Sequence, residues 1–550
     1  MWVTARCLPV SLPPHTSGPA MLFLLLLLAP VSALALRNNW NKACRGSCAY
    51  DLPNAGVLSI VGGDKAVSDI TSAGGWSVLS CDANALSQQI RLVCNSAACE
   101  HLFEGHGAVN TVVRLPESCG ANPFARVASV KVDANQSIPG GAKSKRATGK
   151  YANTVFLIRV DTDFAKVDAS VTGPVEFRIE GYNYQGTVTA PAKDVARRGG
   201  NPTGYNNTLS STLPPIKLNQ KYPLFSGSVN CPNFTASVAT ALNVDVDLTV
   251  SLGLVVAGTV IPAEITQFAV FGGLDGHAGA RLSLDATALG TYSTGKVSLY
   301  SVALAGVDVP GIFTLGPTFD LLGKADANIK SGDLSIGVDL KYNVANARAY
   351  IPPQPSAVGG FNPDNSQLTL SVQPSIKTSG TVSGHLIPQL TLGLNAFSGI
   401  AKAQVYLNLD ASTGIDLSLS ASANASTGTS GNAASGTVDG CVDISAGLGV
   451  NVGASGSLFG LIGEGEYPLY SGAWDLYAKC FSAASKRAPE PGRGLGRIGL
   501  AGAGYRLPGD ARQGLAERAA AANGLTCPTS SSKGQLVTII EQIVGAVKKP

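Results

Sequence analysis

Two aspartates have the spacing that most directly suggests chemistry. Asp245 and Asp247 alternate with apolar residues in a run typical of a β-strand, so both carboxylates point to the same side. Glycoside cleavage requires two carboxyl groups about 5 to 9.5 Å apart, one of them with a raised pKa. Paired aspartates on the polar face of a strand are ordinarily solvated. Asp245 and Asp247 are therefore candidate catalytic residues, but the sequence alone does not show that they catalyse a reaction.

A short stretch rich in histidine and glutamate is the candidate metal site. The segment CEHLFEGH contains His101, Glu104 and His106, and imidazole and carboxylate groups are common metal ligands. Their spacing differs from that of HExxH, which places two histidines on one face of a helix. A surface loop tied by a disulfide at Cys94 or Cys99 is the simpler interpretation, and the sequence predicts no metal and no other cofactor.

The remaining motifs lack the context that their chemistry needs. Asp275 and His277 lie close together in sequence, but the chain contains no GxSxG elbow to supply the nucleophile of a hydrolase. Gly494–Gly499 matches GxGxxG, but it follows a Pro- and Gly-rich stretch instead of a buried strand, so it predicts no dinucleotide site.

The elements that must position these residues are predicted to be antiparallel strands. Apolar residues alternate with Ser, Asp, Asn and Lys over several segments, which is typical of strands with one buried face. These segments are 244–252, 333–342, 404–410, 415–420 and 442–450. The sequence predicts a mainly β protein, in which a small disulfide-rich β domain precedes a large antiparallel β-sheet domain, either a sandwich or a large curved sheet.

Composition divides the chain into five predicted parts. The apolar run ending in alternating small residues predicts a signal peptide over 1–35 and hence a secreted, extracellular protein. A cystine-rich β domain is expected over 37–135, a Gly-rich basic linker over 136–150 and the large β domain over 151–482. Residues 483–550 are expected to form a low-complexity linker and a flexible tail.

The basic charge is concentrated in this tail. Of the net charge of +4, residues 486–550 contribute ten Lys and Arg against four Asp and Glu, so the remainder is about −2. This distribution argues against a nucleic-acid partner. Short helices are predicted at 510–522 and 534–547, and no later segment is apolar enough for a transmembrane helix.

Cysteine usage agrees with secretion. Once Cys7 is removed with the leader, ten cysteines remain, an even number that predicts disulfide bonds. They are Cys44, Cys48, Cys81, Cys94, Cys99, Cys119, Cys231, Cys441, Cys480 and Cys527. The first six are expected to form three bridges, whose connectivity the sequence leaves open; a zinc site is disfavoured because no CxxC pair occurs.

Two kinds of modification motif recur in the chain. N-glycosylation sequons occur at Asn135, Asn206, Asn233 and Asn424, and predict a glycoprotein. The tetrapeptide Ser-Lys-Arg-Ala occurs twice, with paired basic residues at Lys145, Arg146, Lys486 and Arg487. Both pairs are candidate sites for a processing protease, and the alternative is an uncut, solvated linker.

Several short motifs occur together in this chain: 46–53, 69–71, 75–76, 113–117, 119–120, 124–127, 311–317 and 407–410. As a set they resemble an uncharacterised family of secreted, β-rich fungal proteins, chiefly from mushroom-forming species, with a cystine-rich N-terminal domain. The resemblance covers most of residues 37–482 and implies a fungal secretory origin. It carries over no catalytic residue.

We therefore expect a non-catalytic binding or structural protein of the cell wall or cell surface. Its partner is expected to be a cell-wall polysaccharide or an apolar ligand, because the predicted sheets offer broad surfaces rich in Ser, Thr and Asn. Two alternatives remain open: a carbohydrate-active hydrolase whose carboxylates converge in three dimensions, and a lipid-binding β protein.

Overall fold

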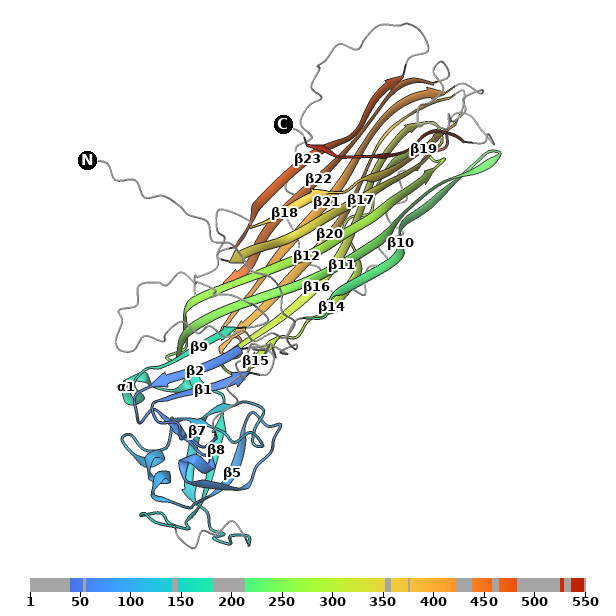
Figure 1. Cartoon of the computed structure of the whole chain (residues 1–550). Coiled ribbons are helices and arrows are strands. Elements are labelled where there is room, and N and C mark those ends of the chain that lie inside the picture. The colour runs from blue at the N-terminus through green and yellow to red at the C-terminus, as the bar shows by residue number, and fades with distance from the viewer. Residues whose placement is uncertain are drawn as a thin grey trace, which may run out of the picture. The chain divides into compact units, whose positions relative to one another are not determined.

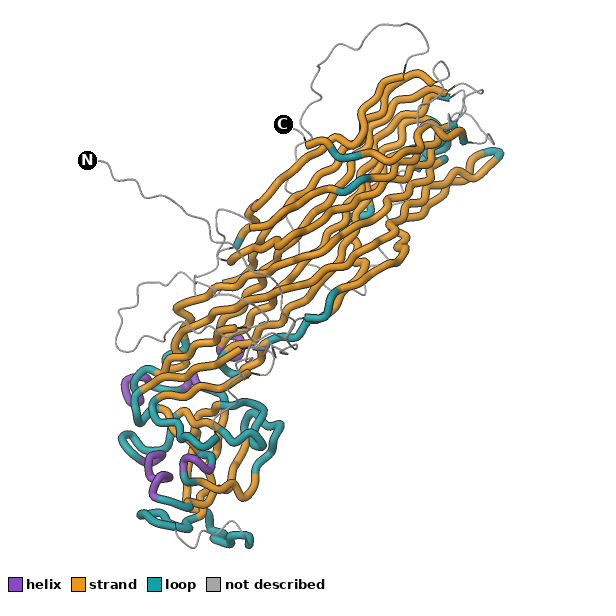
Figure 2. Tube along the Cα trace, in the orientation of Figure 1, coloured by secondary structure: helices purple, strands orange, loops and turns teal. Residues whose placement is uncertain are grey.

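The structure is a computed structural model, and most of the chain that it describes is β-strand (Figure 2). It describes residues 40–52, 56–140, 147–181, 213–351, 358–373, 376–421, 438–457, 464–481, 525–528 and 536–548. Helical pieces are short: η1 (Ser72–Gly74), η2 (Ala97–Phe103), η3 (Phe164–Lys166), α1 (Ala169–Thr172) and η4 (Phe397–Gly399). The predicted mainly β fold with antiparallel sheets and disulfides is confirmed.

The largest sheet, here the ten-stranded sheet, has the order β1-β2-β9-β11-β12-β17-β19-β24, with β10 beside β11 and β18 beside β17. Its strands are β1 (Ser47–Leu52), β2 (Gly56–Gly62), β9 (Val175–Gly181), β10 (Ile216–Cys231), β11 (Phe234–Ile261), β12 (Glu264–Ala286), β17 (Leu334–Ile351), β18 (Val358–Pro363), β19 (Ser366–Val372) and β24 (Val537–Val544). At about 3.3 Å per residue, the 28 residues of β11 span roughly 90 Å.

The nine-stranded sheet has the order β13-β16-β20-β21-β22-β23-β25, with β14 and β15 also paired to β16. Its strands are β13 (Gly290–Ser293), β14 (Val297–Ala303), β15 (Val307–Val309), β16 (Phe313–Ser331), β20 (Lys377–Ala396), β21 (Ala401–Ala421), β22 (Val438–Ser457), β23 (Gly465–Phe481) and β25 (Val547–Lys548). The long central strands of both large sheets run side by side in Figure 1.

The six-stranded sheet belongs to the N-terminal part of the chain and has the order β3-β6-β7-β8-β5-β4. Its strands are β3 (Val67–Asp69), β4 (Trp76–Ser80), β5 (Gln88–Cys94), β6 (Val112–Arg114), β7 (Phe124–Val132) and β8 (Val155–Asp161). The pair β3–β6 is parallel and the other pairs are antiparallel.

The two large sheets pack face to face because each strand buries alternate side chains. In β16, Phe313, Leu315, Pro317 and Phe319 are buried, whereas the residues that alternate with them are partly or fully exposed. Strand β12 lies against β20, and β17 lies against β21 and β22. Apolar side chains from both sheets form one continuous core, as expected for a sandwich.

Close approach between the large sheets depends on small residues and one cross-sheet hydrogen bond. A Cβ at Gly384 of β20 would lie 2.7 Å from a methyl carbon of Leu282 of β12. The hydroxyl of Tyr342 in β17 donates to the carbonyl oxygen of Gly447 in β22, at 3.0 Å. The two sheets therefore contact each other closely at Gly384 and Leu282 and are joined by a hydrogen bond at Tyr342.

One local prediction was wrong, and two predicted strand segments belong to one longer strand. The helix expected over 534–547 is instead β24 followed by β25, because the Val- and Ile-rich run finds strand partners at both sheet edges. The segments 404–410 and 415–420 form the single strand β21, since buried Ala411 and Thr413 continue the alternation between them. The helix predicted at 510–522 lies outside the described residues, as does the predicted signal peptide.

Strand pairing crosses the predicted linker at 136–150. Strand β8 follows this segment in sequence and pairs with β5 and β7, which precede it. Strand β9 also follows it, and joins β2 to β11 of the ten-stranded sheet. The predicted domain bounds remain predictions, and the sheets show that residues on both sides of the linker pair with each other.

Candidate functional site

Antiparallel register brings four polar residues into a row on the outer face of the ten-stranded sheet. Lys217 of β10 lies opposite Asp247 of β11, which lies opposite His277 of β12. His277 in turn lies opposite Asn343 of β17. Residues directly opposite each other in antiparallel strands have Cβ atoms about 5 Å apart, so these side chains are neighbours although the sequence separates them widely.

A β-bulge in β17, where two residues lie opposite Asp275 of β12, hollows the surface beside this row. The register of β12 against β17 shifts between Leu274 and Gly276, and Gly276 has a φ of +128°. A Cβ at this position would lie 2.1 Å from the carbonyl oxygen of Asp247, so only glycine fits there. The resulting open hollow has a volume of about 390 Å³, and its polar lining residues are Asp247, Thr249, Asp275, His277 and Asn343. We call it the acidic hollow.

Of the predicted catalytic pair, Asp247 lines the acidic hollow and Asp245 lies beside it, and both carboxylates are solvated. Lys217 Nζ lies 2.8 Å from Asp247 Oδ2, and His277 Nε2 lies 3.5 Å from Asp245 Oδ1. The side chains of Asp245, Asp247 and His277 are 57%, 41% and 44% exposed. Each carboxylate thus faces a cationic or imidazole partner in water, an arrangement suited to hydrogen bonding with a polar ligand.

The candidate metal ligands are not gathered into a site. His101 lies in η2 and is buried, with Nδ1 3.0 Å from the hydroxyl oxygen of Ser68. Its Nε2 lies 3.8 Å from a carboxylate oxygen of Asp64, whereas Glu104 is exposed at the end of η2. Within the described residues, no group of three or more His, Cys, Asp or Glu side chains is arranged to hold a metal ion.

Four disulfides are present among the described cysteines: Cys44–Cys48, Cys94–Cys99, Cys231–Cys527 and Cys441–Cys480. The last of these joins directly opposite residues of β22 and β23, with Cα atoms 4.0 Å apart. The third N-terminal bridge that the sequence predicts is absent, and Cys81 and Cys119 carry free thiols.

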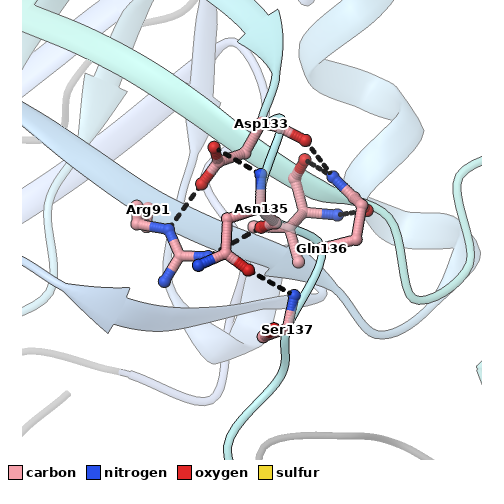
Figure 3. Close-up of polar contacts among 6 residues, drawn as sticks. Arg91, Asp133, Asn135, Gln136 and Ser137 are labelled. Atoms are coloured by element: carbon pink, nitrogen blue, oxygen red, sulfur yellow. Dashed lines mark hydrogen bonds and ion pairs between the residues drawn. The ribbon is translucent and has the colours of Figure 1, made fainter.

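Two of the four predicted glycosylation sites lie on described, exposed residues. Asn233 occupies the turn between β10 and β11. Asn135 follows β7, and Figure 3 shows its side-chain oxygen accepting a hydrogen bond from the N–H of Ser137 at 2.9 Å. In the same view, Arg91 donates to the carboxylate of Asp133 and to the carbonyl oxygen of Asn135.

The other predicted modification sites lie outside the described residues. These are the glycosylation sites Asn206 and Asn424 and the processing sites Lys145, Arg146, Lys486 and Arg487. They remain predictions from the sequence.

A second polar cluster, on β20 and β21 of the nine-stranded sheet, was not predicted. His385 Nδ1 of β20 lies 2.7 Å from Asp410 Oδ1 of β21. Nearby, Gln389 and Asn408 lie opposite each other and are buried, and Gln389 donates a 3.1 Å hydrogen bond to Thr391. The motif 407–410 contained half of this cluster, but the partner strand could not be identified from the sequence.

Comparison with known proteins gives a partial family match. A family model described as a domain of unknown function (DUF7223) matches residues 228–482, which run from the end of β10 to just beyond β23. No curated protein and no solved structure was found to match the chain. No helix in the described part of the chain is long and apolar enough to cross a membrane.

Proposed function

We propose that this protein is an extracellular glycoprotein that binds polysaccharide at a cell wall or cell surface and has no catalytic activity. Four disulfides support an oxidising compartment, because such bonds persist mainly outside the cytosol. The predicted leader and the exposed sequons Asn135 and Asn233 support the same location. The resemblance to secreted fungal proteins favours a fungal wall as the setting.

The acidic hollow is the observation that carries the proposal. Its polar lining combines carboxylate, imidazole, hydroxyl and amide groups on neighbouring, rigidly paired strands. Together these groups both donate and accept hydrogen bonds, and sugar hydroxyls require both. Because the hollow is open and lies on a broad sheet face, it suits one segment of a long polymer better than an enclosed small molecule.

The same observations weigh against the two alternatives. A hydrolase needs one carboxyl group held in a dry environment, whereas Asp245 and Asp247 are exposed and face His277 and Lys217. A lipid-binding sandwich needs open space between its layers, whereas apolar side chains from both large sheets pack into one continuous core.

Binding to insoluble polysaccharides tests the proposal. Purified protein is incubated with chitin or β-glucan particles, and the fraction retained is measured for wild type and for Asp247→Ala and Asn343→Ala. We expect each substitution to lower the association constant at least several-fold, because one or two ligand hydrogen bonds are lost. Asp416→Ala is the matched control, since Asp416 is an exposed aspartate on β21 of the nine-stranded sheet.

Two outcomes would contradict the proposal. If the wild-type protein is not retained on the particles, or if all variants are retained equally, the acidic hollow is not a polysaccharide-binding site. Release of new reducing ends, abolished by Asp245→Asn or Asp247→Asn, would establish the hydrolase alternative instead.

A further inference from the structure

Two thiols in the N-terminal part of the chain lie on connections that meet in space. Cys81 directly follows β4, which is an edge strand of the six-stranded sheet. Cys119 lies in the connection between β6 and β7 and is buried, with 1% of its surface exposed. The other eight described cysteines are already paired.

Backbone hydrogen bonds fix these two connections against each other. The N–H of Gly120 donates to the carbonyl oxygen of Asp82 at 2.8 Å, and the N–H of Ala121 donates to that of Ala85 at 3.3 Å. The side-chain amide of Gln88 accepts from the N–H of Asp82 and donates to its carbonyl oxygen, both at 2.7 Å. Residues on either side of each thiol are therefore held in place.

The thiol of Cys81 lies beside the peptide unit that joins Ser118 to Cys119. The thiol of Cys81 lies 3.6 Å from the carbonyl oxygen of Ser118, the residue before Cys119, and donates to it. Burial raises the pKa of the Cys119 thiol, and a hydrogen bond with Cys81 and the charge of Cys81 raise it further. Cys81 is the more exposed member of the pair, so an oxidant in solution reaches Cys81 first.

We propose that Cys81 and Cys119 are an oxidation site that closes to a disulfide, in addition to the four bridges described above. Closure gives the first six cysteines of the mature chain three bridges: Cys44–Cys48, Cys94–Cys99 and Cys81–Cys119. The sequence predicts three bridges among these six cysteines but leaves their connectivity open. The proposed pairing gives three bridges and specifies which cysteines are joined.

The oxidant is a small-molecule or protein disulfide, and the exchange balances. The thiolate of Cys81 attacks one sulfur of the oxidant, forms a mixed disulfide and releases the first thiol. Cys119 then gives up its proton, and its sulfur attacks Cys81 Sγ and releases the second thiol. The two cysteines lose two protons and two electrons, and the oxidant's S–S bond is reduced to two thiols.

The position of this bridge gives it a structural role that its neighbours lack. The Cys44–Cys48 and Cys94–Cys99 bridges join residues only four and five positions apart. Cys81 and Cys119 are 38 positions apart in the sequence, and their bridge joins edge strand β4 to the β6–β7 connection across the six-stranded sheet. A bridge that closes a longer loop restricts the unfolded chain more strongly.

Thiol labelling of the full-length protein tests the proposal. The protein is equilibrated with oxidised glutathione, denatured without reductant, labelled with N-ethylmaleimide, and digested for mass spectrometry. We expect Cys81 and Cys119 to be unlabelled and to be recovered in one cross-linked peptide, which reduction separates. Labelling of both thiols, or a cross-link from either one to a different cysteine, overturns the proposal.

Single substitutions provide the matched controls. Cys81→Ser is expected to leave Cys119 labelled, and Cys119→Ser is expected to leave Cys81 labelled, while the other four bridges remain in the peptide map. Peptide mapping of the wild-type protein decides the question by itself if either variant fails to fold.

Discussion

At the scale of single residues, the polar side chains of the six-stranded sheet act mainly in folding. Asp69 and Arg114 are both buried and form an ion pair, with Nη2 to Oδ2 at 2.6 Å. Asp69 also accepts hydrogen bonds from the N–H groups of Cys44 and Thr71. The motifs 69–71 and 113–117 therefore contain residues that hold the fold together, because a buried charge needs such partners.

The pair Arg126–Asp161 makes folding dependent on pH. Arg126 of β7 donates two hydrogen bonds to the carboxylate of Asp161 in β8, at 2.8 and 2.6 Å. Burial alone raises the pKa of Asp161, but the hydrogen bonds from Arg126 and from the N–H of Asp163 outweigh it. The folded-state pKa of Asp161 thus lies below its ordinary value of 3.8. The same direction holds for Asp133, whose pKa the hydrogen bond from Arg91 lowers.

We predict that Asp161→Asn reduces the acid sensitivity of the fold. Because the folded-state pKa is lowered, the unfolded chain takes up the proton first as the pH falls. The stabilisation is therefore complete above the ordinary value of 3.8 and is lost as the pH falls through the folded-state pKa. The substitution should cost about 1 to 3 kcal/mol near neutral pH and flatten the decline of unfolding free energy below about pH 5, as measured by chemical denaturation.

A double-mutant cycle with Arg126→Met provides the control. The double variant should lose less stability than the sum of the two single variants, since each single change leaves a charged or polar partner unpaired. An equally steep decline of stability with acid in Asp161→Asn and wild type would contradict the assignment.

At the scale of elements, the packing of the two large sheets depends on leucines fitted against glycines. Gly384 of β20 faces Leu282 of β12, and Gly272 of β12 faces Leu390 of β20, where an added Cβ would lie 2.8 Å from a leucine methyl carbon. Protein interiors are close-packed, so a side chain added at such a position must displace its neighbour. Gly272 and Gly384 are thus required by the packing between the sheets.

We predict that Gly384→Val destabilises the sandwich by about 1 to 3 kcal/mol, because it overpacks the contact with Leu282. The measurement is the free energy of unfolding, and the pair Gly384→Val with Leu282→Ala should recover part of the loss.

Gly393→Ala on the same strand is the matched control. A Cβ there would meet only the carbonyl oxygen of Gly316, at 3.5 Å, an ordinary contact. Equal losses of stability for Gly384→Val and Gly393→Ala would show that strand propensity, and not packing between the sheets, sets the effect.

At the scale of the whole molecule, the C-terminal segment joins the edges of both large sheets. Strand β24 pairs with β19 at the edge of the ten-stranded sheet, and β25 pairs with β23 at the edge of the nine-stranded sheet. The Cys231–Cys527 bridge adds a covalent link from the same part of the chain to the end of β10. The described parts of the predicted tail, 525–528 and 536–548, therefore contribute to the fold.

We predict different consequences for processing at the two paired basic sites. A chain cut after Arg487 should keep its C-terminal piece in denaturant until the Cys231–Cys527 bridge is reduced. A chain cut after Arg146 should lose its N-terminal piece in denaturant alone, because no described disulfide crosses that position and only strand pairs such as β7–β8 hold it. Intact mass spectrometry under native, denaturing and reducing conditions separates these cases.

Cys527→Ser is the control for the cut after Arg487. In this variant, denaturant alone should release the C-terminal piece, without reduction. A single uncut mass under reducing conditions would contradict processing at both sites and would leave 136–150 as a connection within one chain.

The sequence predicted the strand content well and the candidate site only in part. Alternation identified the strands around Asp245, Asp247 and Tyr342, because one buried face imposes a period of two. It could not pair His277 with Asp247 or with Asn343, since strand register depends on partners far apart in sequence. The bulge in β17 left no distinct sequence signal, and Gly276 beside it does not stand out among the many glycines.

By itself, the sequence determined the local features: strands from alternation, turns from Gly, Asn and Pro, disulfide bonding from the ten cysteines that follow the predicted leader, and a basic tail from composition. Tertiary structure decided which residues meet. It placed 537–544 in a strand instead of a helix, because a β-branched run adopts the conformation that its neighbours can hydrogen-bond. It also placed Cys81 against Cys119 and assembled the acidic hollow, because contacts between distant segments arise only when the chain closes on itself.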